Sequence, residues 1–308
     1  MTESLLAIIP LFALIGLGYL ARRTILDSTM LPALNLFVYY FAVPALLFNA
    51  ARRQSLDNLF NWPALAAFVL GIALTATIAI LGSRYFFQCK APTELVMRGL
   101  NSVFANYAYM GIPLTFSLLG EAAATISIIL AGNLLVIGGA QLCIEALRQH
   151  SMSLRQVWNT LDRSLLRSPI FLSTVLGLLA SGLGLQLPQV LNTTLDMLAP
   201  AAIPVALFCL GASLQFRQIQ TSLGELGWLI GIKLLVHPAL TYLAFYLLGV
   251  NDPTWLVATV LLTALPTGAL VHVVAMRYNL FEQASSQIVV FSTLISMLTV
   301  TMWVSLMT

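Results

Sequence analysis

Apolar runs of about 18–25 residues recur along the chain, separated by short polar stretches. A helix of about 20 apolar residues is long enough to cross the roughly 30 Å hydrocarbon core of a bilayer. The first run is expected to be a retained span, because no basic residue precedes it and no clear cleavage site follows it. The pattern predicts an all-α membrane protein with ten transmembrane helices, at 4–21, 31–51, 62–87, 95–119, 122–147, 169–186, 190–214, 227–249, 254–276 and 286–307.

The composition supports this class. Hydrophobic residues make up 59% of the chain and charged residues 8%, whereas soluble domains have about 45–50% and about 25%. The net charge of +3 gives no indication of a nucleic-acid partner. The three cysteines, Cys89, Cys143 and Cys209, have no CxxC spacing and predict neither a disulfide nor a metal site. We expect no cofactor.

The basic residues predict the orientation of the spans. With the N-terminus outside, the outward-facing loops contain only Arg52 and Arg53. Positively charged loops stay on the cytoplasmic side, so both termini are expected outside a bacterial inner membrane. The inward-facing loops contain the remaining loop arginines and lysines: Arg22, Arg23, Arg84, Lys90, Arg148, Arg155, Arg163, Arg167, Arg217 and Arg277.

Related motifs indicate an internal repeat. The stretch 42-AVPALLF-48 in the second span is similar to 202-AIPVALF-208 in the seventh. We therefore predict two five-helix repeats, 1–147 and 169–308, joined by an amphipathic cytoplasmic linker at 148–168. An odd number of spans inverts the second repeat in the membrane, which is typical of secondary transporters.

Prolines and glycines interrupt the fourth and ninth spans, in 111-GIP-113 and 265-LPTG-268. Proline removes a backbone donor, and a freed polar group in lipid costs several kcal/mol unless protein or a wet cavity shelters it. The two spans are therefore expected to break and cross, with Gly111, Pro113, Pro266 and Gly268 at a polar site. Amide ends of the half-helices would then face a carboxylate.

Polar side chains near these breaks are candidates for substrate binding. Ser102, Asn106 and Tyr109 have i, i+4, i+7 spacing and are expected on one helix face. Thr267 is the expected partner of Asn106 from the other helix. Asn133 is a further candidate, although bonding to backbone is at least as good an explanation for it. From Leu95 a straight helix would carry Pro113 past the midplane, so we expect unwinding to begin near Asn106.

Ionisable groups inside spans are candidates for proton or ion coupling. Asp196 either couples proton movement or forms a structural ion pair with Lys233. His272 either relays protons or makes a structural hydrogen bond. No sodium site is identifiable by spacing, so H⁺ and Na⁺ both stay open. Arg98 and Glu145 are expected near the inner surface and solvated.

Four stretches, 35-NLFVYYFAVPALLF-48, 106-NYAYMGIPL-114, 202-AIPVALFCLG-211 and 264-ALPTGALVHVVAMRYN-279, resemble the auxin efflux carrier family. The resemblance implies a fold similar to bile-acid symporters and sodium/proton antiporters. In it, spans 1, 2, 6 and 7 form a scaffold, and spans 3–5 and 8–10 form a moving, elevator-like domain.

The resemblance also implies homodimers and small organic anions as substrates. It places Asn106 on the amide that lines the substrate site, and Pro113 and Pro266 on the crossover prolines. The plant relatives usually have a glutamine at the position of Thr267, and the position of His272 is normally apolar. Both differences favour a small carboxylate such as malonate over an indole acid as the substrate.

The sequence thus predicts a secondary carrier of a small organic anion that works by alternating access. The alternatives are an exporter of an auxin-like indole acid and an ion-coupled symporter of the same fold. An intramembrane enzyme is disfavoured, because HExxH, GxSxG and a supported cysteine–histidine pair are absent from the sequence. A channel is disfavoured because polar residues concentrate at two breaks instead of lining several helices.

Overall fold

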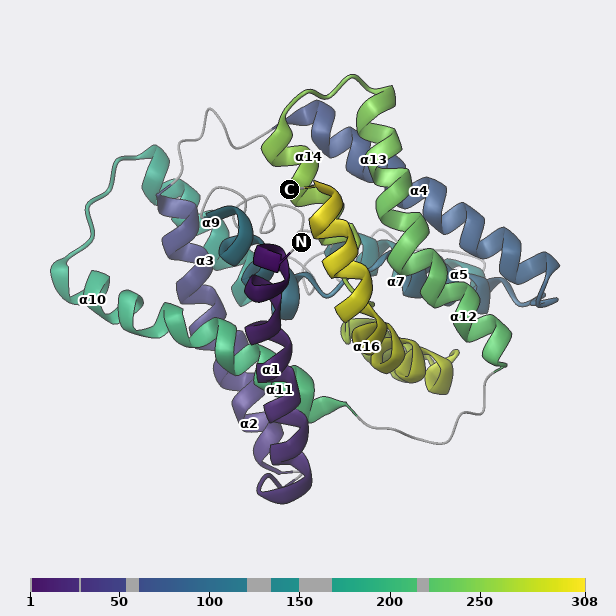
Figure 1. Ribbon diagram of the computed structural model, residues 1–308, viewed down its shortest axis with the longest axis horizontal. Helices are drawn as coiled ribbons and strands as arrows, with labels where there is room; N and C mark the ends of the chain where they lie inside the picture. The colour runs from purple at the N-terminus through teal and green to yellow at the C-terminus, as the bar shows by residue number, and fades with distance from the viewer. Residues whose placement is uncertain are drawn as a thin grey trace. The chain divides into compact units, whose positions relative to one another are not determined.

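The computed structural model describes residues 2–27, 29–53, 61–120, 134–149, 168–214 and 222–307 (Figure 1). Within those ranges every element is helical, apart from an isolated bridge between Ala105 and Thr267. The first elements are α1 (Thr2–Thr24), α2 (Met30–Phe37), η1 (Val38–Ala42), α3 (Val43–Arg52), α4 (Trp62–Tyr85), α5 (Pro92–Val103), η3 (Tyr107–Gly111) and α7 (Leu134–Gln149). The later ones are α9 (Pro169–Gly182), α10 (Gln189–Leu198), η5 (Ala199–Ala201), α11 (Ala202–Ser213), α12 (Leu223–Gly231), η6 (Ile232–Val236), α13 (His237–Leu247), α14 (Pro253–Thr263), α15 (Leu270–Tyr278) and α16 (Glu282–Met307).

Five continuous helical segments are long and apolar enough to cross a membrane. They are Met30–Arg52, Trp62–Tyr85, Gln189–Ser213, Leu223–Leu247 and Glu282–Met307. Each coincides, within a few residues, with one of the ten predicted spans. Three shorter apolar helices, Tyr109–Gly120, Pro169–Gly182 and Pro253–Thr263, fall in further predicted spans.

The first predicted span, 4–21, lies within the continuous helix α1 (Thr2–Thr24). The other predicted spans differ from single straight helices. The 14 residues of α9 rise only about 21 Å, and the spans at 95–119 and 254–276 are each divided in two. The span at 122–147 is described only from Leu134, and the linker at 148–168 lies almost wholly outside the described residues. The full set of ten spans stays a prediction.

The chain divides into two compact units, each built from separate stretches of sequence. Unit 1 comprises the described residues of Met1–Asn61, Tyr107–Ala131 and Leu165–Gln215. Unit 2 comprises those of Trp62–Asn106, Gly132–Ser164 and Phe216–Thr308. Unit 1 thus holds the predicted spans 1, 2, 6 and 7, unit 2 holds spans 3, 8, 9 and 10 and the described part of span 5, and span 4 is divided between them. The predicted five-helix repeats at 1–147 and 169–308 are related by internal symmetry, which this division into units does not test. They stay a prediction.

Close backbone packing organises unit 1, where α1 runs alongside α11 (Figure 1). A Cβ atom added at Gly18 would overlap the carbonyl of Phe208, and one at Gly211 would overlap the carbonyl of Ile15. Glycine is required at both positions because a backbone carbonyl cannot move aside as a side chain can. Small residues at such crossings are the usual means of packing membrane helices tightly.

Unit 2 is packed in a similar way, with α4 alongside α13 (Figure 1). A Cβ at Gly71 would lie 2.7 Å from the Thr241 hydroxyl, and one at Gly82 would overlap the Trp228 ring. A buried apolar cluster joins α4, α12, η6 and α16, through Ala79, Leu226, Leu229, Ile230, Ile232, Leu234 and Ile288. This packing fixes the helices that surround the interruptions described below.

The described chain contains three π-helical segments, η1, η3 and η6, and each ends two residues before a proline. The prolines are Pro44, Pro113 and Pro238. A proline ring clashes with the carbonyl four residues earlier, which here is the middle of the π segment. Widening the turn relieves that clash without ending the helix, so these prolines produce π turns and not breaks.

Candidate functional site

Two interruptions in the helices of unit 2 pair with each other. One is the stretch 104–106 after α5, and the other is 264–269 between α14 and α15. The Asn106 N–H donates to the Pro266 carbonyl at 2.9 Å, and the Gly268 N–H donates to the Phe104 carbonyl at 3.0 Å. Each break therefore satisfies backbone groups that the other exposes, which is what a non-helical segment needs inside an apolar helix layer.

The positions of the breaks correct part of the sequence analysis. The second break contains Pro266, Thr267 and Gly268, as predicted. The first lies at 104–106, close to Asn106, and not at Gly111–Pro113, because 112–120 is helical. Pro113 follows the π turn η3 within the continuous helical stretch 107–120.

The shared face predicted for Ser102, Asn106 and Tyr109 is wrong. The backbone turns extended at Phe104, with φ −80° and ψ 109°, so helical spacing does not continue past Val103. Ser102 instead donates to the Arg98 carbonyl of its own helix at 3.1 Å. Tyr109 belongs to unit 1 and Asn106 to unit 2.

Asn106 is the most distinctive side chain at the paired breaks. It is only 4% exposed, and its amide nitrogen Nδ2 has no hydrogen-bond partner among the described residues. Leaving a buried donor unpaired costs roughly 1–3 kcal/mol. Such a donor is well suited to a ligand that arrives with an acceptor oxygen.

Thr267 is not the partner of Asn106 that the sequence analysis expected. Its hydroxyl donates to the Asn101 carbonyl at 2.8 Å, and its backbone N–H donates to the Ser292 hydroxyl at 3.1 Å. Thr267 therefore ties the second break to α5 and α16. This leaves the Asn106 amide available.

Two serines of α16 support the breaks, and the sequence analysis missed them. Ser292 accepts from the Thr267 N–H, and the Ser285 hydroxyl accepts from the Asn101 amide at 2.9 Å. Both serines are buried. Their spacing of seven residues puts them on one face of α16, but small hydroxyls in an apolar span gave no signal of this role.

The amino end of α15 adds positive potential beside the second break. This helix begins at Leu270, and its N-cap Ala269 provides no side-chain cap. A helix amino end carries roughly half a positive charge. The Val271 and His272 N–H groups already donate to the Gly268 and Ala269 carbonyls, at 3.0 and 3.1 Å. Gly268, directly before it, is tightly enclosed, since an added Cβ would lie 2.8 Å from the Phe104 ring and 2.9 Å from the Ala105 carbonyl oxygen.

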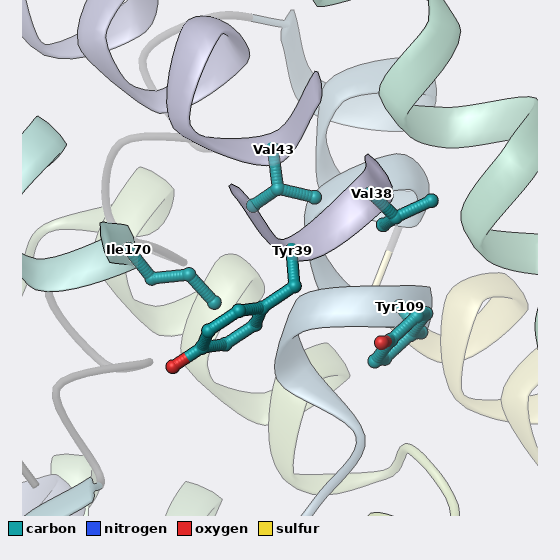
Figure 2. Close-up of a pocket in the computed structure, with 5 residues that line it drawn as sticks. All are labelled: Val38, Tyr39, Val43, Tyr109 and Ile170. Carbon is teal, nitrogen blue, oxygen red and sulfur yellow. The ribbon is translucent and has the colours of Figure 1, made fainter. Parts of the chain in front are cut away.

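Tyr109 lies within unit 1. Its hydroxyl donates to the Asn35 side-chain oxygen at 3.5 Å. It also borders a cavity of about 10 Å³, lined with Val38, Tyr39, Val43 and Ile170 (Figure 2). A space of that size holds about one water molecule. The predicted site residues Gly111 and Pro113 are in the same unit and buried, whereas Asn133 lies outside the described residues.

The ionisable candidates have different surroundings. Asp196 accepts from the Asn49 amide at 3.0 Å and pairs with Arg53 at 3.5 Å, so its ion pair is with Arg53 and not with Lys233. Lys233 is fully buried and donates to the Thr263 carbonyl at 2.6 Å. His272 lies in the first turn of α15 and is partly buried.

Arg98 is buried and paired, which corrects the expectation that it is solvated. Its guanidinium donates to Glu225 at 2.7 Å and to Glu94 at 2.9 Å, and stacks over the Phe281 ring at 4.0 Å. Glu145, predicted to be solvated as well, is partly buried and accepts from the Tyr278 hydroxyl at 2.7 Å. The pair of Arg98 and Glu225 joins α5 to α12.

Comparison with known proteins gives consistent results over the whole chain. The sequence model of the family described as "Membrane transport protein" matches residues 4–304. A protein of Rhizobium meliloti named "Putative malonate transporter" is 32% identical, over 96% of this chain and 92% of its own length. The transporter YfdV of Escherichia coli, whose function is uncharacterized, is 23% identical over 96% of this chain and 95% of its own length. Auxin efflux carrier component 8 of Arabidopsis thaliana is 23% identical, over 94% of both chains.

Proposed function

Because the chain belongs to the membrane transport protein family, together with auxin efflux carriers, we propose that it is a secondary carrier of a small organic anion. The chain is an integral membrane protein with several apolar helices. The substrate class in this proposal is a mono- or dicarboxylate such as malonate, which the name of the 32% identical relative supports.

One observation carries the proposed binding site: the buried, unpartnered amide of Asn106 beside the paired breaks. In the proposed complex, Asn106 Nδ2 donates to a substrate carboxylate. The amino end of α15 adds a favourable potential for the negative charge. Hydrogen bonds to charged acceptors contribute about 1.5–3 kcal/mol each, so one amide makes a measurable difference.

Alternating access is proposed to occur by movement of unit 2 relative to a scaffold formed by unit 1. The grouping of helices supports this, because unit 1 collects the predicted spans 1, 2, 6 and 7. The second half of span 4 is the exception, since residues from Tyr107 group with unit 1. The chain is proposed to form homodimers.

The membrane potential gives the proposed carrier a driving force. An anion that leaves a cell with a negative interior gains about 2.3 kcal/mol per charge per 100 mV. Export of an organic anion therefore needs no coupled ion, whereas uptake needs H⁺ or Na⁺. The proposed location is the bacterial inner membrane.

A ligand screen tests the substrate class. The purified chain is heated with malonate, other dicarboxylates, monocarboxylates and indole acids, and the unfolding midpoint is recorded for each. A ligand that binds the folded state raises that midpoint. We expect a rise with small carboxylates. A rise with indole acids alone would favour the auxin-like alternative, and no rise with any acid would contradict an organic-anion carrier.

A further inference from the structure

Lys233 lies in unit 2, in the π segment η6, and no acidic side chain among the described residues bonds to it. Its side chain is fully buried, and within the described residues its ammonium bonds to the Thr263 carbonyl, at 2.6 Å, and to His237 Nδ1, at 3.4 Å. The ion pairs within the described part of the chain involve other cations, Arg53 and Arg98. Lys233 is therefore a buried amine whose surroundings, within the described residues, supply no full negative charge.

Such an arrangement is costly. An ammonium removed from water needs a paired charge or a complete set of hydrogen bonds to balance its lost hydration. The carbonyl end of α14, where Thr263 is the last residue, supplies roughly half a negative charge. Arg98 in the same unit shows the usual solution, because two carboxylates face its guanidinium.

The other ionisable groups around η6 do not compensate Lys233. The elements packed against it are α4, α5, α12, α13 and α16. Their titratable or charged side chains are Arg84, Tyr85, Glu94, Arg98, Glu225, His237, Tyr242, Tyr246 and Glu282. Of these, His237 alone lies within hydrogen-bond distance of the ammonium. Glu94 and Glu225 are bound to Arg98.

Through its bond to the Thr263 carbonyl, Lys233 lies next to one of the paired breaks. Thr263 is followed directly by the break at 264–269. Thr267 is four positions after Thr263, so the two residues lie at most about 14 Å apart even in a fully extended chain. Inside protein, charges at that separation still interact, because screening by water is weak.

We propose that the transported anion supplies the missing counter-charge of Lys233. In this proposal, which rests on the proposed function, Lys233 is a positioning residue and not a direct ligand. In its protonated form, Lys233 raises the affinity of the paired breaks for anions in proportion to ligand charge. The site therefore prefers a dicarboxylate to a monocarboxylate of equal size, and the carrier has a built-in cation at the break of its ninth predicted span.

Substitution of His237 tests this without removing Lys233. In His237→Asp a carboxylate stands four residues from Lys233 on a helical segment, where the two side chains can pair. His237→Asn has nearly the same shape without the charge and is the matched control. Binding of malonate, a dianion, and of malonamate, a monoanion of the same size, is measured by calorimetry at one pH and salt concentration.

We expect His237→Asp to bind malonate at least tenfold more weakly than His237→Asn does. For malonamate the loss should be about threefold, because the ligand carries half the charge. Lys233→Gln should show the same charge-dependent loss, and Lys233→Arg should restore the preference for malonate. Equal affinities for Asp and Asn variants, or equal losses for both ligands, would overturn the proposal. If the unmodified chain bound no acid, the proposed function would fail instead.

Discussion

At the scale of single residues, several buried polar groups in unit 2 are satisfied by partners distant in sequence. Arg98 and Glu225 are 127 positions apart, and Asn101 and Ser285 are 184 apart. No local pattern in the chain indicates such pairs, which is why Arg98 was expected to be solvated. The sequence did identify Asn106 as an unusual amide, because an asparagine beside aromatic residues and a Gly-x-Pro motif is conspicuous within an apolar span.

The pair of Arg98 and Glu225 gives a prediction about stability. Glu225→Gln leaves a buried guanidinium without its closest carboxylate, which should cost about 3 kcal/mol. The midpoint of thermal unfolding should then fall by roughly 6–12 °C. Glu94→Gln is the matched control, because the Glu94 side chain is 40% exposed and exposed pairs contribute about 1 kcal/mol at most. If Glu225→Gln and Glu94→Gln lowered the unfolding midpoint equally, Glu225 would not be the main carboxylate partner of Arg98.

At the scale of helices, prolines have two different structural effects that the sequence does not distinguish. Pro266 lies within a true break, whereas Pro44, Pro113 and Pro238 follow π turns in otherwise continuous helices. The break at 104–106 contains no proline at all. It is stabilised by pairing with the other break, a long-range interaction that hydropathy and local propensity do not report. For this reason the sequence predicted the break at Pro266 directly, whereas unwinding near Asn106 was predicted only from the length of the helix that precedes Pro113.

Contact between α1 and α11 gives a prediction at this scale. Gly211→Ala would bring a methyl group against the Ile15 carbonyl, so we expect a loss of about 1–3 kcal/mol in the free energy of unfolding. Gly16→Ala, on the same pair of helices, is the control, because nothing lies within 4 Å of its added Cβ. Denaturation of both variants in detergent measures the difference. Equal stability would show that the helices do not approach at Gly211.

At the scale of the whole molecule, the positive-inside distribution predicts where each loop lies. We expect residue 90 on the cytoplasmic side and residue 251 on the outer side. Lys90→Cys and Asn251→Cys are made in a chain whose Cys89, Cys143 and Cys209 are replaced by serine. A membrane-impermeant maleimide should label position 251 in intact cells, and position 90 only after the membrane is opened. The reverse pattern would invert the proposed orientation.

The measurement that most directly tests the central claim is calorimetric titration of the purified chain with malonate, compared with Asn106→Ala. Loss of one amide donor to a carboxylate should weaken binding roughly 10–100-fold, with an unchanged unfolding midpoint in the absence of ligand. Asn251→Ala, in an exposed loop, should bind as the unmodified chain does. If Asn106→Ala bound malonate as tightly as the unmodified chain, the paired breaks would not be the anion site.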